Sequence, residues 1–233
     1  MNNIPISNKI PELDLAIKAA QEAGNTILKI YEKGFKTFTK TDNSPVTDAD
    51  LQSNKIIKEI LSVTKHSILS EEDVDDKNRL SNDMVWIIDP LDGTSDFIDK
   101  TGEFTVMIAL VENQKPILGV IAWPTEKTLF VAQKNCGAFR YSDNKWEKIS
   151  VTKISELPKC RTIGSRHHLS DKEKDFIEKI GIKDFTSIGS SLKVGKISSG
   201  QAEVYITTTN KMKEWDTAAS HCIISEAGGK MTD

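Results

Sequence analysis

Two aspartates stand in the segment of the sequence that is richest in chemistry. Asp89 and Asp92 follow the apolar run 85–88 in Val-Trp-Ile-Ile-Asp-Pro-Leu-Asp-Gly-Thr. We expect a buried strand that stops at Asp89-Pro90, because a proline disfavours helix for the residue before it. Gly93 then permits a tight turn into a short helix. Carboxylates at a strand end beside a helix N-terminus are suited to binding divalent metals and a phosphate group.

Three further acidic clusters lie at the edges of predicted elements. They are Asp48-Ala-Asp50 at a helix start, Ser70-Glu-Glu-Asp73 after the apolar pair Ile68-Leu69, and Glu214-Trp-Asp216 before an Ala-rich helix. Each cluster alone is more often a helix cap or a solvated charge. Four acidic clusters at element edges together indicate that their side chains converge on one pocket.

Metal-assisted phosphoester hydrolysis explains why a pocket would collect carboxylates. Mg²⁺ is a hard cation that prefers oxygen ligands and shares phosphate oxygens with the protein. Two metal ions about 3.5–4 Å apart can hold both the attacking and the leaving oxygen of an in-line displacement. A hydroxyl beside a carboxylate, such as Thr94 near Asp50, can orient the water that attacks.

Helices and strands must bring these residues together. Apolar residues recur every three or four positions over 13–31, which predicts an amphipathic helix, and a second helix opens near Thr47 or Asp48. The β-rich runs 104–111 and 116–123 predict an antiparallel hairpin. The other expected elements are strands at 128–132, 161–164 and 186–188, an extended segment at 203–207, and helices at 170–180, 191–199 and 217–227.

The pattern of predicted strands and helices changes near residue 150. Strands and helices alternate after that point, which argues for an α/β second half. We therefore expect two halves of one body: an N-terminal α+β half, 1–150, with most of the metal ligands, and a C-terminal α/β half, 151–233, with the substrate-side residues.

Composition and charge exclude several classes of protein. The 233 residues are 38% hydrophobic and 28% charged, with a net charge of −3, so neither disorder nor a nucleic-acid partner is expected. Residues 1–9 lack the apolar stretch of a signal peptide, and the run 104–111 is too short to span a bilayer. Three widely separated cysteines predict a reducing cytoplasm and no disulfide partner.

The combined motifs resemble the inositol monophosphatase superfamily, and within it the 3′(2′),5′-bisphosphate nucleotidase branch. The superfamily motifs are Trp-Ile-Ile-Asp-Pro-Leu-Asp-Gly-Thr at 86–94, Glu-Glu after Ser70, and Trp-Asp-Thr-Ala-Ala at 215–219. The branch motifs are Lys-Thr-Asp-Asn-Ser-Pro-Val-Thr-Asp-Ala-Asp at 40–50, Leu-Ser-Glu-Glu-Asp at 69–73, Gly-Glu-Phe-Thr-Val at 102–106, Lys-Pro-Ile-Leu-Gly at 115–119, Ser-Arg-His-His at 165–168 and Ser-Ile-Gly-Ser-Ser-Leu-Lys at 187–193.

This resemblance implies a fold and an activity. The fold is a layered αβαβα sandwich. The activity is lithium-sensitive, Mg²⁺-dependent hydrolysis of the 3′-phosphate of adenosine 3′,5′-bisphosphate, a by-product of sulfation and sulfate assimilation, to AMP and phosphate. The expected protein is cytoplasmic, with peripheral inner-membrane association as an alternative, and is a monomer or a homodimer.

The resemblance also implies a role for each matching residue. Glu71, Asp89 and the Leu91 carbonyl would bind one Mg²⁺, and Asp89, Asp92 and Asp216 a second, while Glu71 supports a third, weaker ion through water. Asp50 and Thr94 match the pair that activates water, and Glu71 is counted with them as catalytic. The expected substrate-binding residues are Leu91, Asp92, Gly93, Thr94, Ser95, Ser165, Arg166, His168, Gly189, Ser190, Ser191, Lys193 and Asp216.

The chain departs from the branch pattern at two places. Ser95 and Asp96 stand where the branch commonly has Lys and Glu, so a contact to the substrate is expected to be missing. Relatives continue beyond the Ala-Gly-Gly at 227–229 with a further strand and helix, which the sequence up to Asp233 is expected to lack.

Three other functional hypotheses compete with the nucleotidase interpretation. An aspartyl-phosphate phosphatase needs its two aspartates two positions apart, whereas Asp89 and Asp92 are three apart with a proline between them. An inositol-1-phosphatase or a broad sugar-phosphate phosphatase on the same fold is closer, although Lys193 and the segment 44–47 favour the nucleotide. A non-catalytic regulatory binding module would be expected to have lost one of the acids, and all of them are present.

Overall fold

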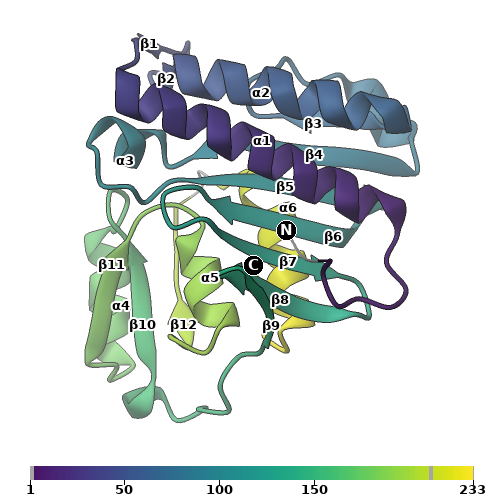
Figure 1. The fold of residues 1–233 in the computed structure, drawn as a ribbon. Helices are drawn as coiled ribbons and strands as arrows, with labels where there is room; N and C mark the ends of the chain where they lie inside the picture. The colour runs from purple at the N-terminus through teal and green to yellow at the C-terminus, as the bar shows by residue number, and fades with distance from the viewer. Residues whose placement is uncertain (1–2, 210–211, 233) are drawn as a thin grey trace.

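A seven-stranded sheet, in the order β3-β4-β5-β6-β7-β8-β9, forms the centre of the computed structural model, which describes residues 3–209 and 212–232 (Figure 1). β3 and β4 are parallel, and the later neighbours are antiparallel. The strands are β3 (Ser67–Ser70), β4 (Met84–Asp92), β5 (Thr105–Glu112), β6 (Lys115–Trp123), β7 (Thr128–Gln133), β8 (Gly137–Ser142) and β9 (Lys145–Ile149).

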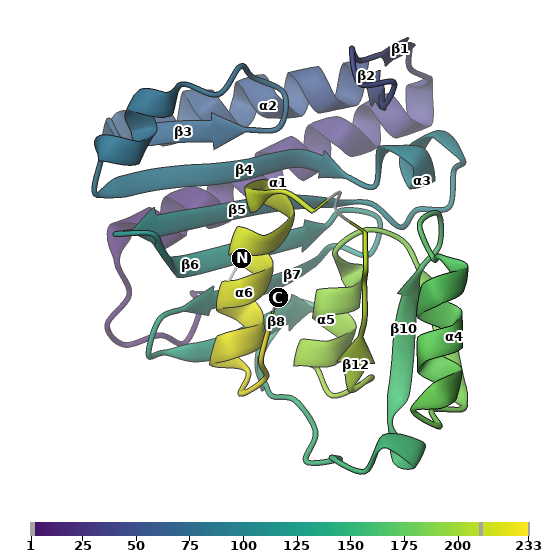
Figure 2. The ribbon, with the colours of Figure 1, turned by 180° about the vertical axis from the view of Figure 1, so that it is seen from behind.

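Helices cover both faces of this sheet. α1 (Pro11–Lys33) and α2 (Asp48–Leu61) lie side by side on one face, and α6 (Glu214–Glu226) crosses the other (Figures 1 and 2). Both faces are therefore dry, which is why the strands read as continuous apolar runs. α6 packs closely because β6 offers Gly119, whose Cβ, if present, would stand 2.6 Å from the carbonyl oxygen of Ala219.

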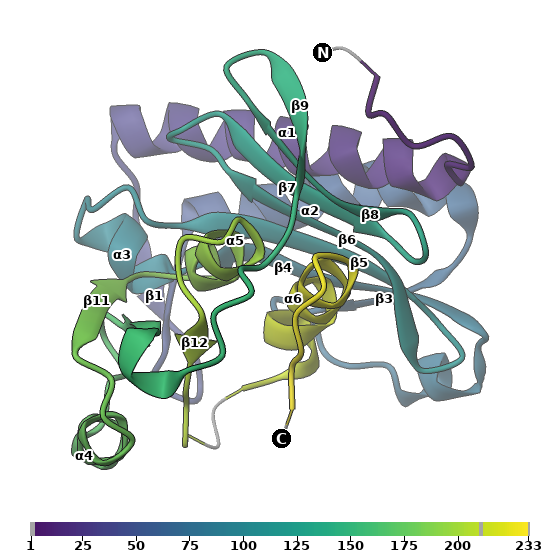
Figure 3. The same cartoon turned by 90° about the horizontal axis from the view of Figure 1, so that it is seen from below.

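A smaller parallel sheet, in the order β11-β10-β12, lies beyond α5 (Leu192–Ser198). Its strands are β10 (Arg161–Ser165), β11 (Asp184–Ile188) and β12 (Val204–Tyr205). Leu192 of α5 packs on Ile163 and Ile188, and α4 (Asp171–Lys179) covers the opposite face (Figure 3). The layers thus follow the order helix, sheet, helix, sheet, helix.

Short elements complete the frame around the strand ends. β1 (Thr37–Thr39) pairs antiparallel with β2 (Pro45–Thr47), and α3 (Thr94–Ile98) follows β4 directly. The 3₁₀ turns are η1 (Ser62–Thr64), η2 (Lys77–Ser81) and η3 (Leu157–Lys159). Among the described residues, no helix combines the length and the apolar character needed to cross a bilayer.

Most predicted elements are present, but the predicted end of the strand at Asp89-Pro90 is wrong. β4 continues to Asp92, and its register with β5 shifts between Asp89 and Asp92. That irregularity accommodates Pro90, which has no N–H for a ladder bond. The last helix also begins earlier than predicted, so Asp216 lies in its first turn. The division at residue 150 remains a prediction, and its outer bounds, 1 and 233, lie outside the described residues.

Candidate active site

Three carboxylates converge where β4 meets the start of α6. Asp89, Asp92 and Asp216 each place an oxygen within 4.8 Å of the others. The irregular end of β4 supplies two of them, Asp89 and Asp92, which flank the register shift with β5. α6 supplies the third, and the Lys213 N–H donates to Asp216 Oδ2 at 2.6 Å. Sequence reasoning predicted this convergence.

The electrostatics of these three acids favour a bound cation. Burial, followed by the charges of Glu71, Asp92 and Asp216, raises the pKa of Asp89 well above its ordinary value. Burial and Asp92 raise the pKa of Asp216 to about 7. Crowded carboxylates repel one another, and a divalent cation relieves that repulsion. The oxygen donors are those that Mg²⁺ prefers, so the residues present fit a hard divalent metal.

Asp50 and Thr94 form a hydrogen-bonded pair beside this cluster. Thr94 Oγ1 donates to Asp50 Oδ1 at 3.0 Å and lies 3.3 Å from the Leu91 carbonyl oxygen. The other oxygen of Asp50 accepts from the amide and the hydroxyl of Thr47, the N-cap of α2. Asp50 is only 1% exposed, and this burial raises its pKa. A buried carboxylate bonded to a hydroxyl can accept a proton through that hydroxyl.

Glu71 lies at the end of β3 with a lysine against it. Lys40, from the β1–β2 hairpin, donates to Glu71 at 2.9 Å and to Glu72 at 2.7 Å. Burial alone would lower the pKa of Lys40, but the charges of the two glutamates raise it. Burial raises the pKa of Glu72 to about 7. The hairpin thereby brings a positive charge to the edge of the acid cluster.

The turn from β4 into α3 begins directly after Asp92. Gly93 has φ +90°, a left-handed conformation that glycine adopts without strain. Its position next to Ser190 and the Glu103 carbonyl leaves little room for a side chain. Thr94 and Ser95 follow in the first turn of α3, both half-buried. The amides of 93–95, which the resemblance expects to hold the phosphate that is cleaved, thus follow directly after Asp92 in the chain.

The segment 189–193 of the second half reaches the same cluster. The Ser191 amide donates to Asp92, and Ser191 Oγ is 2.7 Å from Thr105 Oγ1, which itself donates to Asp92 at 3.2 Å. Lys193 is 8% exposed, donates to the Ser190 carbonyl and lies 5.4 Å from the Tyr205 ring centroid. Burial lowers the pKa of Lys193. The segment thus carries a cation to the site.

Ser165, Arg166 and His168, which the resemblance expects to bind substrate, lie at the end of β10 and in the turn after it. Ser165 Oγ accepts from the His168 amide at 3.2 Å, and both histidines lie in a turn and not in a strand. Arg166 is paired to Glu103 at 2.6 Å and to Asp96 at 3.3 Å, and His167 lies 3.3 Å from Asp96. The charge of Arg166 is therefore already balanced by two carboxylates.

Sequence reasoning missed how Glu103 and Asp96 connect these segments. Glu103 Oε2 accepts from the Gly189 amide at 2.7 Å, as well as from Arg166. Asp96 is 2% exposed and fills the space beside Gly189. Glu103 belongs to the Gly-Glu-Phe-Thr-Val motif, so a signal existed, although nothing in the sequence named its distant partner.

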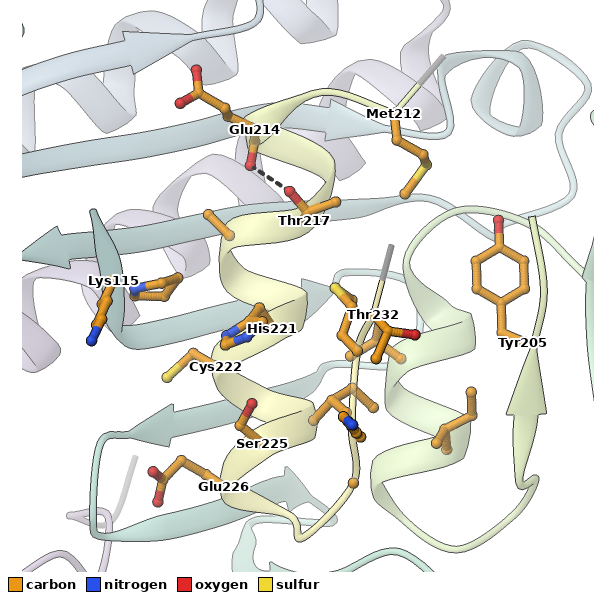
Figure 4. Close-up of a pocket in the computed structure, with 18 of the residues that line it drawn as sticks. Lys115, Tyr205, Met212, Glu214, Thr217, His221, Cys222, Ser225, Glu226 and Thr232 are labelled. Carbon is orange, nitrogen blue, oxygen red and sulfur yellow. Dashed lines mark hydrogen bonds between the residues drawn. The ribbon is translucent and has the colours of Figure 1, made fainter. Parts of the chain in front are cut away.

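A large cavity lies along α6. It is an open groove of about 1700 Å³ whose lining includes Tyr205, His221 and Cys222 (Figure 4). Its lining mixes aliphatic side chains with polar and charged ones, and it does not include the three clustered aspartates. The Thr217 hydroxyl at its upper end donates to the Glu214 carbonyl at 3.3 Å. Chemistry, and not cavity size, therefore locates the candidate active site.

A layered αβαβα body with carboxylates gathered at a strand end defines a class of metal-dependent phosphatases. The chain belongs to the inositol monophosphatase family, whose model matches residues 10–233. It is 36% identical to the 3′(2′),5′-bisphosphate nucleotidase CysQ of Shigella flexneri, over 95% of this chain and 90% of that protein. It is 38% identical to CysQ of Buchnera aphidicola, over 94% and 83%.

Solved structures agree with this placement. CysQ from Bacteroides thetaiotaomicron superposes with a TM-score of 0.81 at 37% identity, covering 93% of this chain and 86% of that one. The IMPase of Thermotoga maritima superposes with a TM-score of 0.83 at 28% identity, covering 96% and 86%. The layered fold expected from the sequence is confirmed.

Proposed function

We propose that this chain is a Mg²⁺-dependent 3′(2′),5′-bisphosphate nucleotidase that hydrolyses the 3′-phosphate of adenosine 3′,5′-bisphosphate to AMP and phosphate. The observation that carries the proposal is the meeting of two groups at one strand end. A crowded, buried set of carboxylates lies beside a hydroxyl–carboxylate pair that can take a proton. The CysQ relatives support the choice of a bisphosphate nucleotide over other phosphomonoesters.

The acid cluster would hold the metal ions. Asp89, Asp92 and Asp216 would share one, and Glu71 and the Leu91 carbonyl would complete a second site around Asp89. Bound Mg²⁺ would supply Lewis-acid polarisation of the phosphate and a lower pKa for the attacking water. Lys40 would leave Glu71 when a cation takes its place, because it now neutralises that carboxylate.

Asp50 and Thr94 would handle the proton of the attacking water. Thr94 Oγ1 donates to Asp50 Oδ1, so the lone pairs of its oxygen are free to accept a water proton. The raised pKa of Asp50 makes it a better proton acceptor than an exposed aspartate. The amides of Gly93, Thr94 and Ser95 would hold the phosphate oxygens, which prefer such donors at a helix start.

The second half would recognise the rest of the nucleotide. The segments 189–193 and 165–168 carry the cations Lys193 and Arg166. A second phosphate group is a dianion that these cations would bind. Gly189, Ser190, Ser191, Ser165 and His168 would line the same side. Asp96 and Ser95, at the positions where the branch commonly has Glu and Lys, would leave this subsite less positive than in those relatives.

Parallel phosphate-release assays test the proposal. Adenosine 3′,5′-bisphosphate and inositol 1-phosphate are each incubated with the full chain and Mg²⁺, with EDTA, and with Mg²⁺ plus Li⁺. The proposal expects fast release from the nucleotide that EDTA abolishes and Li⁺ inhibits. A preference for inositol 1-phosphate would replace the substrate while keeping the mechanism, and a folded chain that releases phosphate from neither would refute the proposal.

Three further parts of the proposal concern the whole protein. The site draws ligands from both halves, 1–150 and 151–233, so we propose that these halves act as one catalytic body. We also propose a cytoplasmic location and a role in sulfur metabolism, where this nucleotide arises. Fractionation of cells that produce the chain tests the location.

A further inference from the structure

One carboxylate oxygen of Glu103 accepts three hydrogen bonds. Oε2 of Glu103 accepts from the Gly189 amide at 2.7 Å and from Nη2 and Nε of Arg166 at 2.6 and 3.2 Å. The Glu103 side chain is 22% exposed and the Arg166 side chain 37%, so water reaches the ion pair, whereas the bond to the Gly189 amide is partly buried. Charge-assisted bonds of this kind are stronger than neutral ones. Two segments of the second half are thus tied to the residues that lead into β5.

The Gly189 amide begins a turn that ends at the acid cluster. Ser190 adopts φ +47°, a left-handed conformation that surrounding contacts must hold in place. The next residue, Ser191, donates its amide to Asp92 and shares a 2.7 Å hydroxyl contact with Thr105. The turn is therefore fastened at its first residue to Glu103 and at its last to Thr105, two positions further along the chain.

We propose that Glu103 is a positioning residue that holds the Gly189 amide so that the Ser191 amide reaches Asp92. Asp96 assists by closing the space beside Gly189, which prevents the turn from sliding toward α3. Calling Asp92 a metal ligand rests on the proposed function, whereas the link from Glu103 to Ser191 rests on the hydrogen bonds alone. The same oxygen of Glu103 also forms the ion pair with Arg166.

Two conservative variants separate the reach of Glu103 from its charge. Glu103→Gln keeps the length of the side chain and an acceptor for the Gly189 amide, but it loses the charge that pairs with Arg166. Glu103→Asp keeps the charge but withdraws the acceptor by one methylene. If Glu103 served only the ion pair, Glu103→Gln would perturb the turn at 189–191 more than Glu103→Asp. Our proposal expects the opposite order.

Amide hydrogen exchange, measured by NMR on the full chain in EDTA, tests this order without any substrate. In Glu103→Asp the shorter carboxylate no longer reaches the Gly189 amide. We expect the loss of this bond to speed amide exchange at Gly189 and Ser191 at least about twentyfold. Glu103→Gln is expected to stay within about fivefold of wild type. Glu112→Gln, at the exposed far end of β5, is the matched control and should leave both amides unchanged.

Kinetics with adenosine 3′,5′-bisphosphate give the second readout. We expect Glu103→Asp to lower kcat about tenfold and to raise the Mg²⁺ concentration for half-maximal rate, with Glu103→Gln close to wild type in both. Equal exchange rates in the two variants, or faster exchange in the glutamine variant, would overturn the proposal. A wild-type chain that does not hydrolyse the nucleotide would refute the proposed function alone, and the exchange rates would still decide the role of Glu103.

Discussion

Asp89→Asn should make the metal-free protein more stable while it removes activity. Asp89 is 1% exposed and lies with its oxygens within 4.8 Å of two other carboxylates. At that distance and an effective dielectric constant of about 20, one pair of like charges costs about 3.5 kcal/mol. Asp92 and Asp216 are half-buried, so water screens part of this, and we expect the asparagine to gain about 2 kcal/mol.

The asparagine variant also keeps the local structure. Its side-chain oxygen can still accept the Leu91 amide, which donates to Asp89 Oδ1 at 3.1 Å. A gain of about 2 kcal/mol corresponds to a rise in Tm of roughly 4–8 °C for a chain of this size. Turnover should fall about a thousandfold or more, because the metal ligand that we propose Asp89 to be would contribute several kcal/mol to the transition state.

Thermal unfolding in EDTA and again in Mg²⁺ is the assay. Wild type should gain Tm when Mg²⁺ is added, since a ligand that binds only the folded state stabilises it. Asp89→Asn should have a higher Tm than wild type in EDTA, and its Tm should rise little when Mg²⁺ is added. Asp83→Asn, an exposed aspartate just before β4, is the matched control and should behave as wild type. An Asp89→Asn protein that melts lower in EDTA and keeps its Mg²⁺ response would refute the reasoning.

Three other predictions follow from single contacts. Thr94→Val should lower kcat about a hundredfold, because Asp50 loses the hydroxyl that we propose links it to the attacking water, while Thr94→Ser restores most of the rate in the same phosphate-release assay. Cys222, whose pKa burial raises to about 12, should be the slowest thiol to react with a disulfide reagent at pH 8, and rapid labelling without unfolding would contradict this. Glu203 has its pKa lowered from 4.5 to about 2 by its hydrogen bonds to Arg161, so its contribution to stability is full above pH 4.5 and is lost as the pH falls toward 2. Glu203→Gln should therefore lower the free energy of unfolding by about 1.5–3 kcal/mol at pH 7 and flatten its dependence on acid pH, as urea titrations at several pH values would report.

Local patterns predicted the acids well because each one is marked by its immediate neighbours. Asp89 and Asp92 stand next to an apolar run, a proline and a glycine, and the helix that begins with Asp48 carries Thr47 as its N-cap. Such signals depend on a few residues of sequence. They placed α1, the β5–β6 hairpin and α3 correctly.

Long-range contacts could not be predicted in the same way. The bond from the Gly189 amide to Glu103 joins residues 86 positions apart, and no local pattern encodes its partner. The end of β4 was misplaced because the proline rule holds for regular strands, whereas the register shift beside β5 removes the conflict. The hairpin of β8 and β9 was missed because its strands are short and place arginine, lysine and glutamate between their apolar residues.

The geometry of the acid cluster depends on how closely α6 approaches the sheet. Asp216 stands almost one helical turn before Ala219, and Ala219 lies directly against Gly119 of β6. A side chain at Gly119 would push against backbone atoms of α6, which cannot move aside cheaply. The position of the Asp216 carboxylate at the start of α6 therefore depends on Gly119 in the middle of β6. This close packing sets the separation between Asp216 and the two aspartates of β4, and it explains why the carboxylates stay together despite their repulsion.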